Sequence, residues 1–163
     1  MKVLFPILFS FAVIAVTGCN KMHNPSKNFT LCDFIEFDGN GMTPDVEYML
    51  NPFDSISKEF IDKDFSLSLD IRYNEGCEIR TLPLIIQYPD LLQDTIVKKE
   101  ISMPLFNKED RAMGIGNYGI YESNLLLIDN IKSSDTFFIS ISTREPHTSG
   151  IISIGVIGLH LNT

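Results

Sequence analysis

The feature that most constrains the fold of this 163-residue chain is a two-residue alternation of apolar and polar side chains. In residues 65–71 a Phe, two Leu and an Ile alternate with two Ser and an Asp, and residues 46–50 repeat the pattern. Successive side chains of a β-strand point to opposite faces of its sheet, so this period is typical of a strand with one buried face. No window of ordinary helical length has an amphipathic apolar stripe. The chain is therefore predicted to be all-β.

Further strands are predicted from apolar runs that turn residues separate. Residues 82–88 and 118–128 are more continuously apolar, which favours strands that lie centrally or are buried on both faces. Residues 96–103 contain Lys98 and Lys99, which indicates an edge or solvent-facing strand. Residues 136–142 and 151–161 complete the set. About seven or eight mostly antiparallel strands predict a single β-sandwich, because two half-buried sheets must cover each other.

The amino terminus has the layout of an export signal. Lys2 is followed by an apolar run over residues 3–16, which is too short to span a membrane. The run ends in residues 16–19, Val-Thr-Gly-Cys, which resemble a lipobox, where small residues precede a cysteine that becomes lipidated. The sequence predicts a lipoprotein signal peptide over residues 1–18, cleaved between Gly18 and Cys19, with lipid on Cys19. The alternative is an ordinary signal peptide that contains a cysteine.

The rest of the chain divides into a tether and one domain. Residues 19–30 are predicted to be the lipidated cysteine and a flexible tether, because they are polar and contain Pro25. Residues 31–163 are predicted to form the β-sandwich, held at the membrane by acyl chains. Removal of the signal peptide takes away Lys2 only, so 12 basic residues face 21 acidic ones. This acidic excess opposes binding to nucleic acid or to anionic lipid headgroups.

Two cysteines remain once Cys19 carries lipid. Exported compartments favour disulfides, so Cys32 and Cys77 are candidates for a disulfide bond. The alternative is that each thiol packs as a small hydrophobic group.

The residues do not indicate an enzyme. Residues 114–119 match Gly-x-Gly-x-x-Gly, but a dinucleotide site needs a helix after this motif and a strand is predicted there. A turn or bulge that uses the conformational freedom of glycine is expected instead. The other candidates for metal ligands or acid–base groups are scattered, and we expect them on the surface or in solvated loops. They are His23, His147, His160, Asp62, Asp64, Glu109 and Asp110. No catalytic residue, metal or cofactor is predicted.

Three segments carry a family resemblance. Arg72 is followed ten residues later by Leu82, and residues 105–116 contain Gly114 and Gly116, separated by one residue. The third segment contains Arg144, Gly150, Ile151, Ile154, Gly155 and Val156. With the lipobox, these features resemble the gliding motility lipoprotein GldH family of Bacteroidetes. The chain differs where the family has an aromatic pair, which falls on Cys77 and Ile79 here, and where the family has a tryptophan, which falls on Ala112.

The resemblance implies an envelope accessory protein of the gliding and associated secretion machinery, with no catalytic residues to carry over. Its partners would be envelope proteins of that machinery, met by protein–protein contact. Residues 54–56 and 94–96 also look like the Asp-Ser/Thr-apolar motif that Bacteroidetes glycosylate on exported proteins. Ser55 and Thr95 are thus candidates for O-glycosylation, although Asp54 and Ser55 fit a turn equally well.

The residues after Cys19 predict where the domain faces. Residues 20–23, Asn-Lys-Met-His, lack the acidic cluster of surface-exported Bacteroidetes lipoproteins, and no Asp follows Cys19 to retain the protein at the inner membrane. We therefore expect an outer-membrane anchor with the domain in the periplasm. The alternative function is a carbohydrate- or ligand-binding envelope lipoprotein. Sugar sites usually present exposed aromatic rings, so the absence of Trp and the small number of Tyr, five, count mildly against it.

Overall fold

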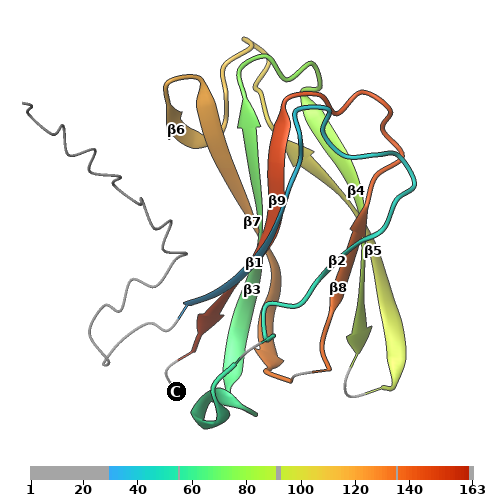
Figure 1. Cartoon of the computed structure of the whole chain (residues 1–163), viewed down its shortest axis with the longest axis vertical. Helices are drawn as coiled ribbons and strands as arrows, with labels where there is room; N and C mark the ends of the chain where they lie inside the picture. Colours follow the sequence, from blue (N-terminus) through green and yellow to red (C-terminus); the bar gives the residue numbers. More distant parts are fainter. Residues whose placement is uncertain (1–29, 55, 91–92, 135, 162–163) are drawn as a thin grey trace, which may run out of the picture.

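The computed structural model describes residues 30–54, 56–90, 93–134 and 136–161, which form two facing antiparallel sheets (Figure 1). One sheet has the strand order β1-β9-β3-β7-β6 and the other has the order β2-β8-β4-β5. The strands are β1 (Thr30–Glu36), β2 (Tyr48–Leu50), β3 (Asp64–Asn74), β4 (Thr81–Asp90), β5 (Thr95–Pro104), β6 (Ile115–Asn117), β7 (Ile120–Lys132), β8 (Ile139–Ser142) and β9 (Ile151–His160). The described residues contain one 3-10 helix, η1 (Lys58–Phe60), and no α-helix. The predicted all-β sandwich is confirmed.

The hydrophobic core lies between the two sheets and comes from every second side chain of the interior strands. Its members in β3 and β4 are Phe65, Leu67, Leu69, Ile71, Tyr73, Leu82, Leu84, Ile86 and Tyr88. Phe53 packs edge-on against Phe65, with ring centroids 5.3 Å apart, and closes one end of this core. Burial of a large apolar side chain contributes roughly 1.5–3 kcal/mol relative to exposure. The alternation in the sequence thus supplies most of the apolar contact between the sheets.

β4 and β7 are interior strands of their sheets, but neither is buried on both faces. In β4 buried residues alternate with more exposed ones, and in β7 the side chains are half-buried or exposed, with Leu126 55% exposed. In the part of the chain that the structure describes, each sheet is covered by the other on one face only. Of the two alternatives predicted for these strands, the central position is confirmed and burial on both faces is wrong.

β5 is an edge strand of the four-stranded sheet, as its two lysines predicted. Lys99 pairs with Ile86, whose side chain is in the core, so Lys99 emerges on the inward side of the strand. Its ammonium lies 5.4 Å from the centre of the Tyr88 ring and 3.4 Å from the carbonyl oxygen of Leu127 on β7. An inward charge on an edge strand opposes pairing with another chain. Lys99 therefore opposes edge-to-edge pairing with another chain on the side of the sandwich between β5 and β7.

β1 and β6 were not predicted from the sequence. β1 forms a regular ladder with β9, but its inward positions include Asp33, which interrupts the apolar pattern. The Asp33 carboxylate accepts a hydrogen bond from the backbone N–H of Asn51, at 2.8 Å, and so links β1 to the end of β2. A polar side chain thus occupies an inward position of β1 at which the alternation pattern would place an apolar one, and it connects the two sheets by a hydrogen bond.

Candidate functional site

The connection from β5 to β6, which joins strands of different sheets, is fixed to the core by one hydroxyl group. The side chain of Tyr73 is completely buried in β3. Its hydroxyl donates a hydrogen bond to the carbonyl oxygen of Leu105, at 2.7 Å, and accepts one from the N–H of Gly114, at 3.0 Å. Burial raises the pKa of the Tyr73 phenol, and the N–H groups of Gly114 and Met113 oppose the rise. Tyr73 therefore holds both ends of the connection.

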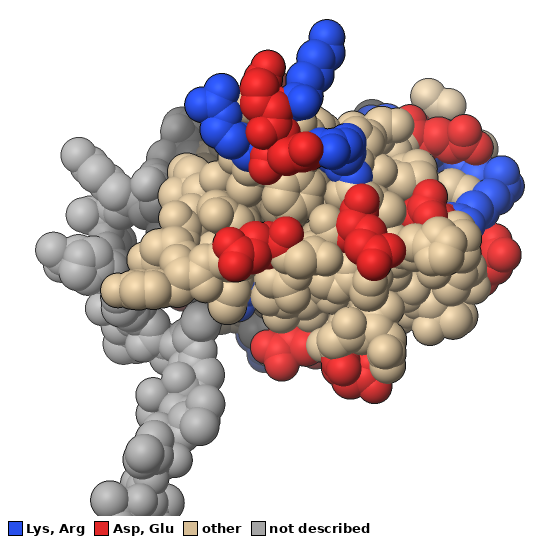
Figure 2. Space-filling model, turned by 90° about the horizontal axis from the view of Figure 1, so that it is seen from above, with Lys and Arg blue, Asp and Glu red and all other residues tan. Residues whose placement is uncertain are grey.

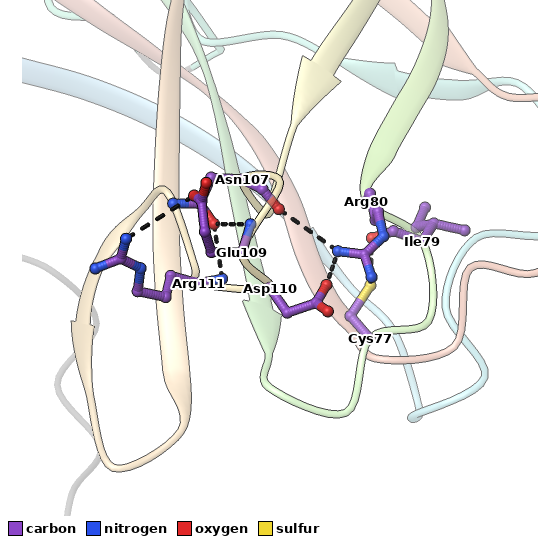
Figure 3. A network of polar contacts seen from close by, with 7 residues as sticks. All are labelled: Cys77, Ile79, Arg80, Asn107, Glu109, Asp110 and Arg111. Atoms are coloured by element: carbon purple, nitrogen blue, oxygen red, sulfur yellow. Dashed lines mark hydrogen bonds and ion pairs between the residues drawn. The ribbon is translucent and has the colours of Figure 1, made fainter.

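Between these ends, Asn107 and Arg80 organise the loop (Figure 3). The side-chain oxygen of Asn107 accepts hydrogen bonds from the backbone N–H groups of Glu109, at 3.0 Å, and Arg111, at 2.9 Å. The Arg80 guanidinium donates to the carbonyl oxygen of Asn107, at 3.5 Å, and forms an ion pair with Asp110. Glu109 in turn lies 3.9 Å from the guanidinium of Arg111. Glu109 and Asp110 are thus loop residues with basic neighbours rather than a pair of acid–base groups.

The Gly-x-Gly-x-x-Gly motif forms a tight β-hairpin between β6 and β7. A Cβ atom on Gly114 would lie 2.5 Å from the carbonyl oxygen of Glu122, and one on Gly116 would lie 2.0 Å from that of Ile120. The two turn residues, Tyr118 and Gly119, have φ angles of 52° and 76°. Positive φ at both positions is the signature of a type I′ turn. The predicted turn is confirmed, because β7 follows where a dinucleotide site would have a helix.

The hairpin tip exposes large apolar side chains. Ile115 is 90% exposed and Tyr118 is 98% exposed. Residues 112–121 carry no charge, although the whole chain has a net charge of −8. Seen from above, acidic side chains are spread over the molecule and the basic ones stand mostly at its rim (Figure 2). The tip of the β6–β7 hairpin, residues 115–121, is therefore an apolar projection without charged residues of its own on an acidic protein.

A shallow cavity of about 380 Å³ lies beside this tip. Its lining residues are Arg72, Ile115, Gly116, Asn117, Tyr118, Ile120, Tyr121 and Glu122. Arg72 and Glu122, from neighbouring strands, form a half-exposed ion pair with 3.5 Å between nitrogen and oxygen. The cavity thus combines an aromatic and aliphatic wall with one polar pair.

The structure does not bring Cys32 and Cys77 together, and no disulfide joins them. Cys32 is exposed on β1 and pairs with Ile157 of β9. Cys77 is buried in the β3–β4 turn, against the backbone of Gly150 just before β9, and its thiol donates to the carbonyl oxygen of Ile79 (Figure 3). Seven residues of extended chain between Gly150 and Ile157 span about 23 Å, far beyond the reach of a disulfide. The disulfide prediction is wrong, because the cysteines meet opposite ends of β9.

The remaining predicted residues lie apart. Gly18, Cys19, His23 and Ser55 are outside the described residues. Thr95 is exposed at the start of β5, and His147 is exposed in the β8–β9 loop. His160 was expected at the surface but is half-buried, with its ring 5.4 Å from that of Phe60 and 5.3 Å from that of Phe65. It closes the same end of the core as these aromatic residues.

No three His, Cys, Asp or Glu side chains of the described residues gather closely enough to hold a metal ion. No helix in the same residues has the length and apolar character needed to cross a membrane.

Comparison with known proteins does not assign a family. No protein-family model matches the chain, and no curated protein sequence matches it. One solved structure that aligns with it is the virus-like particle of extra small virus from the giant freshwater prawn Macrobrachium rosenbergii, with 11% identity over 100% of this chain and 94% of that chain and a TM-score of 0.29. Another is a Bacillus endospore appendage from a family of disulfide-linked pili, with 12% identity over 90% of this chain and 100% of that chain and a TM-score of 0.29. At these scores neither likeness carries an argument, and the GldH resemblance stays a prediction.

Proposed function

We propose that the protein is a lipid-anchored cell-envelope lipoprotein that acts by protein–protein contact, and that the β6–β7 hairpin makes this contact. The observation that carries the proposal is the nearly complete exposure of Ile115 and Tyr118 on a hairpin tip, residues 115–121, that has no charged residue. Large aromatic and aliphatic anchors at the centre of an interface provide much of the binding energy in protein complexes. An apolar concave surface on another envelope protein would fit this projection.

The conformation of Tyr118 supports a role outside the folded domain. Tyr118 has a φ angle of 52°, which is unusual for a bulky residue. Asn or Gly is preferred at this position of a type I′ turn. Strained positions of this kind typically cost about 1–3 kcal/mol and gather at functional sites. Tyr118 contributes nothing to the core that would offset such a cost, because it is 98% exposed.

The hairpin is also held in place before any partner binds. Tyr73 fixes Gly114 at its base, and the hydrogen bonds around Asn107 order the preceding loop. A contact element that is already ordered loses less conformational entropy on binding, which leaves more of the interaction energy as affinity. The lipobox at Cys19 supports attachment to the membrane, and the GldH resemblance supports partners in a gliding or secretion machinery at the periplasmic side of the outer membrane.

The test is site-specific photo-crosslinking in whole cells. A photoreactive amino acid at Tyr118 should join the protein to one envelope protein, and the same group at Ile96 should not. Ile96 is a matched control because it is exposed on β5 in the other sheet. Ile115→Asp should abolish the Tyr118 product while leaving the domain folded, since the side chain lies in solvent. Equal products from both positions, or none from Tyr118, would contradict the proposal.

A second candidate function is glycan binding at the cavity beside the hairpin. It is favoured by the combination of Tyr118 and Tyr121 with the polar pair Arg72 and Glu122 around 380 Å³. Aromatic rings pack against the apolar faces of sugars, and polar groups fix their orientation. Binding to a glycan array that Tyr118→Ala abolishes, together with no photo-crosslinked protein, would favour this function over protein contact.

A further inference from the structure

Asp70 lies on the wrong face of β3 for a buried residue. Even-numbered side chains of β3 point away from the core, as exposed Arg72 illustrates, yet Asp70 is only 1% exposed. Among the residues that the structure describes, neither oxygen of its carboxyl group makes a hydrogen bond of good geometry, although the side chains of Glu122 and Asn124 lie close enough to affect its charge. A carboxylate on an open sheet face would ordinarily be hydrated, and an ionised carboxylate without water or a partner is strongly unfavourable. The neighbouring strands must therefore shield Asp70 from solvent.

The shield comes from β1 by way of a glycine in β9. Gly155 pairs with Asp70 on one side and with Phe34 of β1 on the other. A Cβ atom on Gly155 would lie only 2.1 Å from the Phe34 ring, so the ring occupies the place of the missing side chain. The Phe34 ring thus lies over β9 on the same face and in the same row as Asp70, where it is placed to cover the carboxyl while β1 is docked.

The charges that face Asp70 do not neutralise it. From β7 it meets the carboxyl of Glu122 and the amide of Asn124, and from its own strand the guanidinium of Arg72. Arg72 already forms an ion pair with Glu122. The neighbours from β9 and β1 in these rows are Gly155, Ser153, Phe34 and Glu36. Burial raises the pKa of Asp70 to about 6, Glu122 adds to the rise, and Asn124 and Arg72 oppose it.

We propose that Asp70 is a proton-operated latch for β1, in which the neutral carboxyl lets Phe34 stay packed on Gly155 and the ionised carboxyl releases β1 from β9. Ionisation transfers the carboxyl proton to water, and the carboxylate then gains hydration only when Phe34 moves away. β1 is the first strand after the predicted tether, so release of β1 would lengthen the link between lipid and domain. The latch does not depend on the proposed function of the hairpin.

The direction of the effect follows from the two states of the carboxyl. With β1 docked, Asp70 keeps its proton up to about pH 6, and with β1 open the hydrated carboxyl returns to its ordinary pKa of 3.8. Opening therefore releases a proton above pH 4, and the equilibrium constant for opening rises with pH. Between pH 5 and pH 7.5 the two pKa values predict an increase of about tenfold.

Hydrogen exchange resolved by segment tests the latch in the full exported chain. After correction for intrinsic rates, protection of residues 30–36 should fall about tenfold between pH 5 and pH 7.5. Protection of β5, an edge strand in the other sheet, should not change, because its local opening leaves Asp70 covered. Asp70→Asn, which is neutral at both pH values, should remove the change, and Asp129→Asn, an exposed position on β7, should retain it.

Two further conditions separate the latch from other causes. Glu122→Gln removes the like charge and should move the fall in β1 protection to lower pH. A chelator should leave the profile unchanged, because the proposal neutralises Asp70 with a proton and not a cation. A pH response that persists in Asp70→Asn, extends equally to β5, ignores Glu122→Gln or depends on a chelator would overturn the proposal.

Discussion

Replacing Tyr73 by phenylalanine would remove one buried oxygen atom and the two hydrogen bonds that it makes. The ring would still fill its place in the core against Phe106 and Tyr121, whose centroids lie 5.4 and 5.8 Å away. The carbonyl oxygen of Leu105, a fully buried residue, would lose one of two donors and keep the N–H of Met113, at 2.8 Å, whereas the N–H of half-buried Gly114 would lose its acceptor. Tyr73→Phe therefore isolates the energy of the anchor from that of packing.

The expected loss can be worked from these two groups. A buried polar group left without a partner costs about 1–3 kcal/mol. This cost applies to the N–H of Gly114, which is half-buried and falls toward the lower part of the range. The Leu105 oxygen keeps the Met113 N–H and loses one hydrogen bond, which is worth about 0.5–1.5 kcal/mol. Together they predict a decrease of about 1.5–3 kcal/mol in the free energy of unfolding, a large share of the roughly 5–15 kcal/mol typical of a domain.

Urea unfolding of the purified protein measures this decrease. With a slope of about 1–3 kcal/mol per molar urea, the midpoint should fall by roughly 1–2 M. Tyr121→Phe removes a hydroxyl from the half-buried neighbouring ring and is the control, with an expected loss below about 1 kcal/mol. If the two variants lose the same amount, the Tyr73 hydroxyl does not anchor the β5–β6 connection and the account of the ordered hairpin is wrong.

Four other outcomes follow from the sequence and structure. Tyr118→Asn creates the Asn-Gly turn that type I′ prefers and should raise the free energy of unfolding by about 0.5–1 kcal/mol in thermal melts, while abolishing the photo-crosslinked product. Gly150 and Gly39 have similar φ angles, 91° and 89°, but a Cβ atom on Gly150 would lie only 2.6 Å from the backbone of the β3–β4 turn, whereas one on Gly39 would meet open space. In urea unfolding, Gly150→Ala should therefore cost at least about 2 kcal/mol more than Gly39→Ala, because it adds a backbone clash to the same φ strain. The folded state holds the Asp70 proton to higher pH than the unfolded state. The Asp70 contribution to stability should therefore fall by roughly 2 kcal/mol as pH rises from 4 to 7, seen as a growing advantage of Asp70→Asn over wild type. Cys19→Ser should abolish metabolic labelling by an acyl-chain analogue, and label retained in that variant would contradict the lipobox.

Local patterns in the sequence were sufficient to predict features that depend on a single strand or turn. The alternation over residues 65–71 predicted which face of β3 enters the core, because the two-residue period of a strand is a property of its own backbone. Lys98 and Lys99 predicted an edge, because charged side chains are tolerated where one side of a strand meets solvent. The glycines of residues 114–119 predicted a turn, since positive φ and close backbone approach are local demands.

The tertiary structure decided everything that depends on which strands become neighbours. The same two-residue alternation that buries Phe65 places Asp70 on the outer face, yet Asp70 is buried there, in a row where the Phe34 ring from β1 lies over Gly155. Cys32 and Cys77 looked like a pair by compartment and number, but β9 separates them because each contacts a different end of it. Pairing between strands distant in sequence is set by the register and packing of the whole sandwich, and no local period in the chain encodes it.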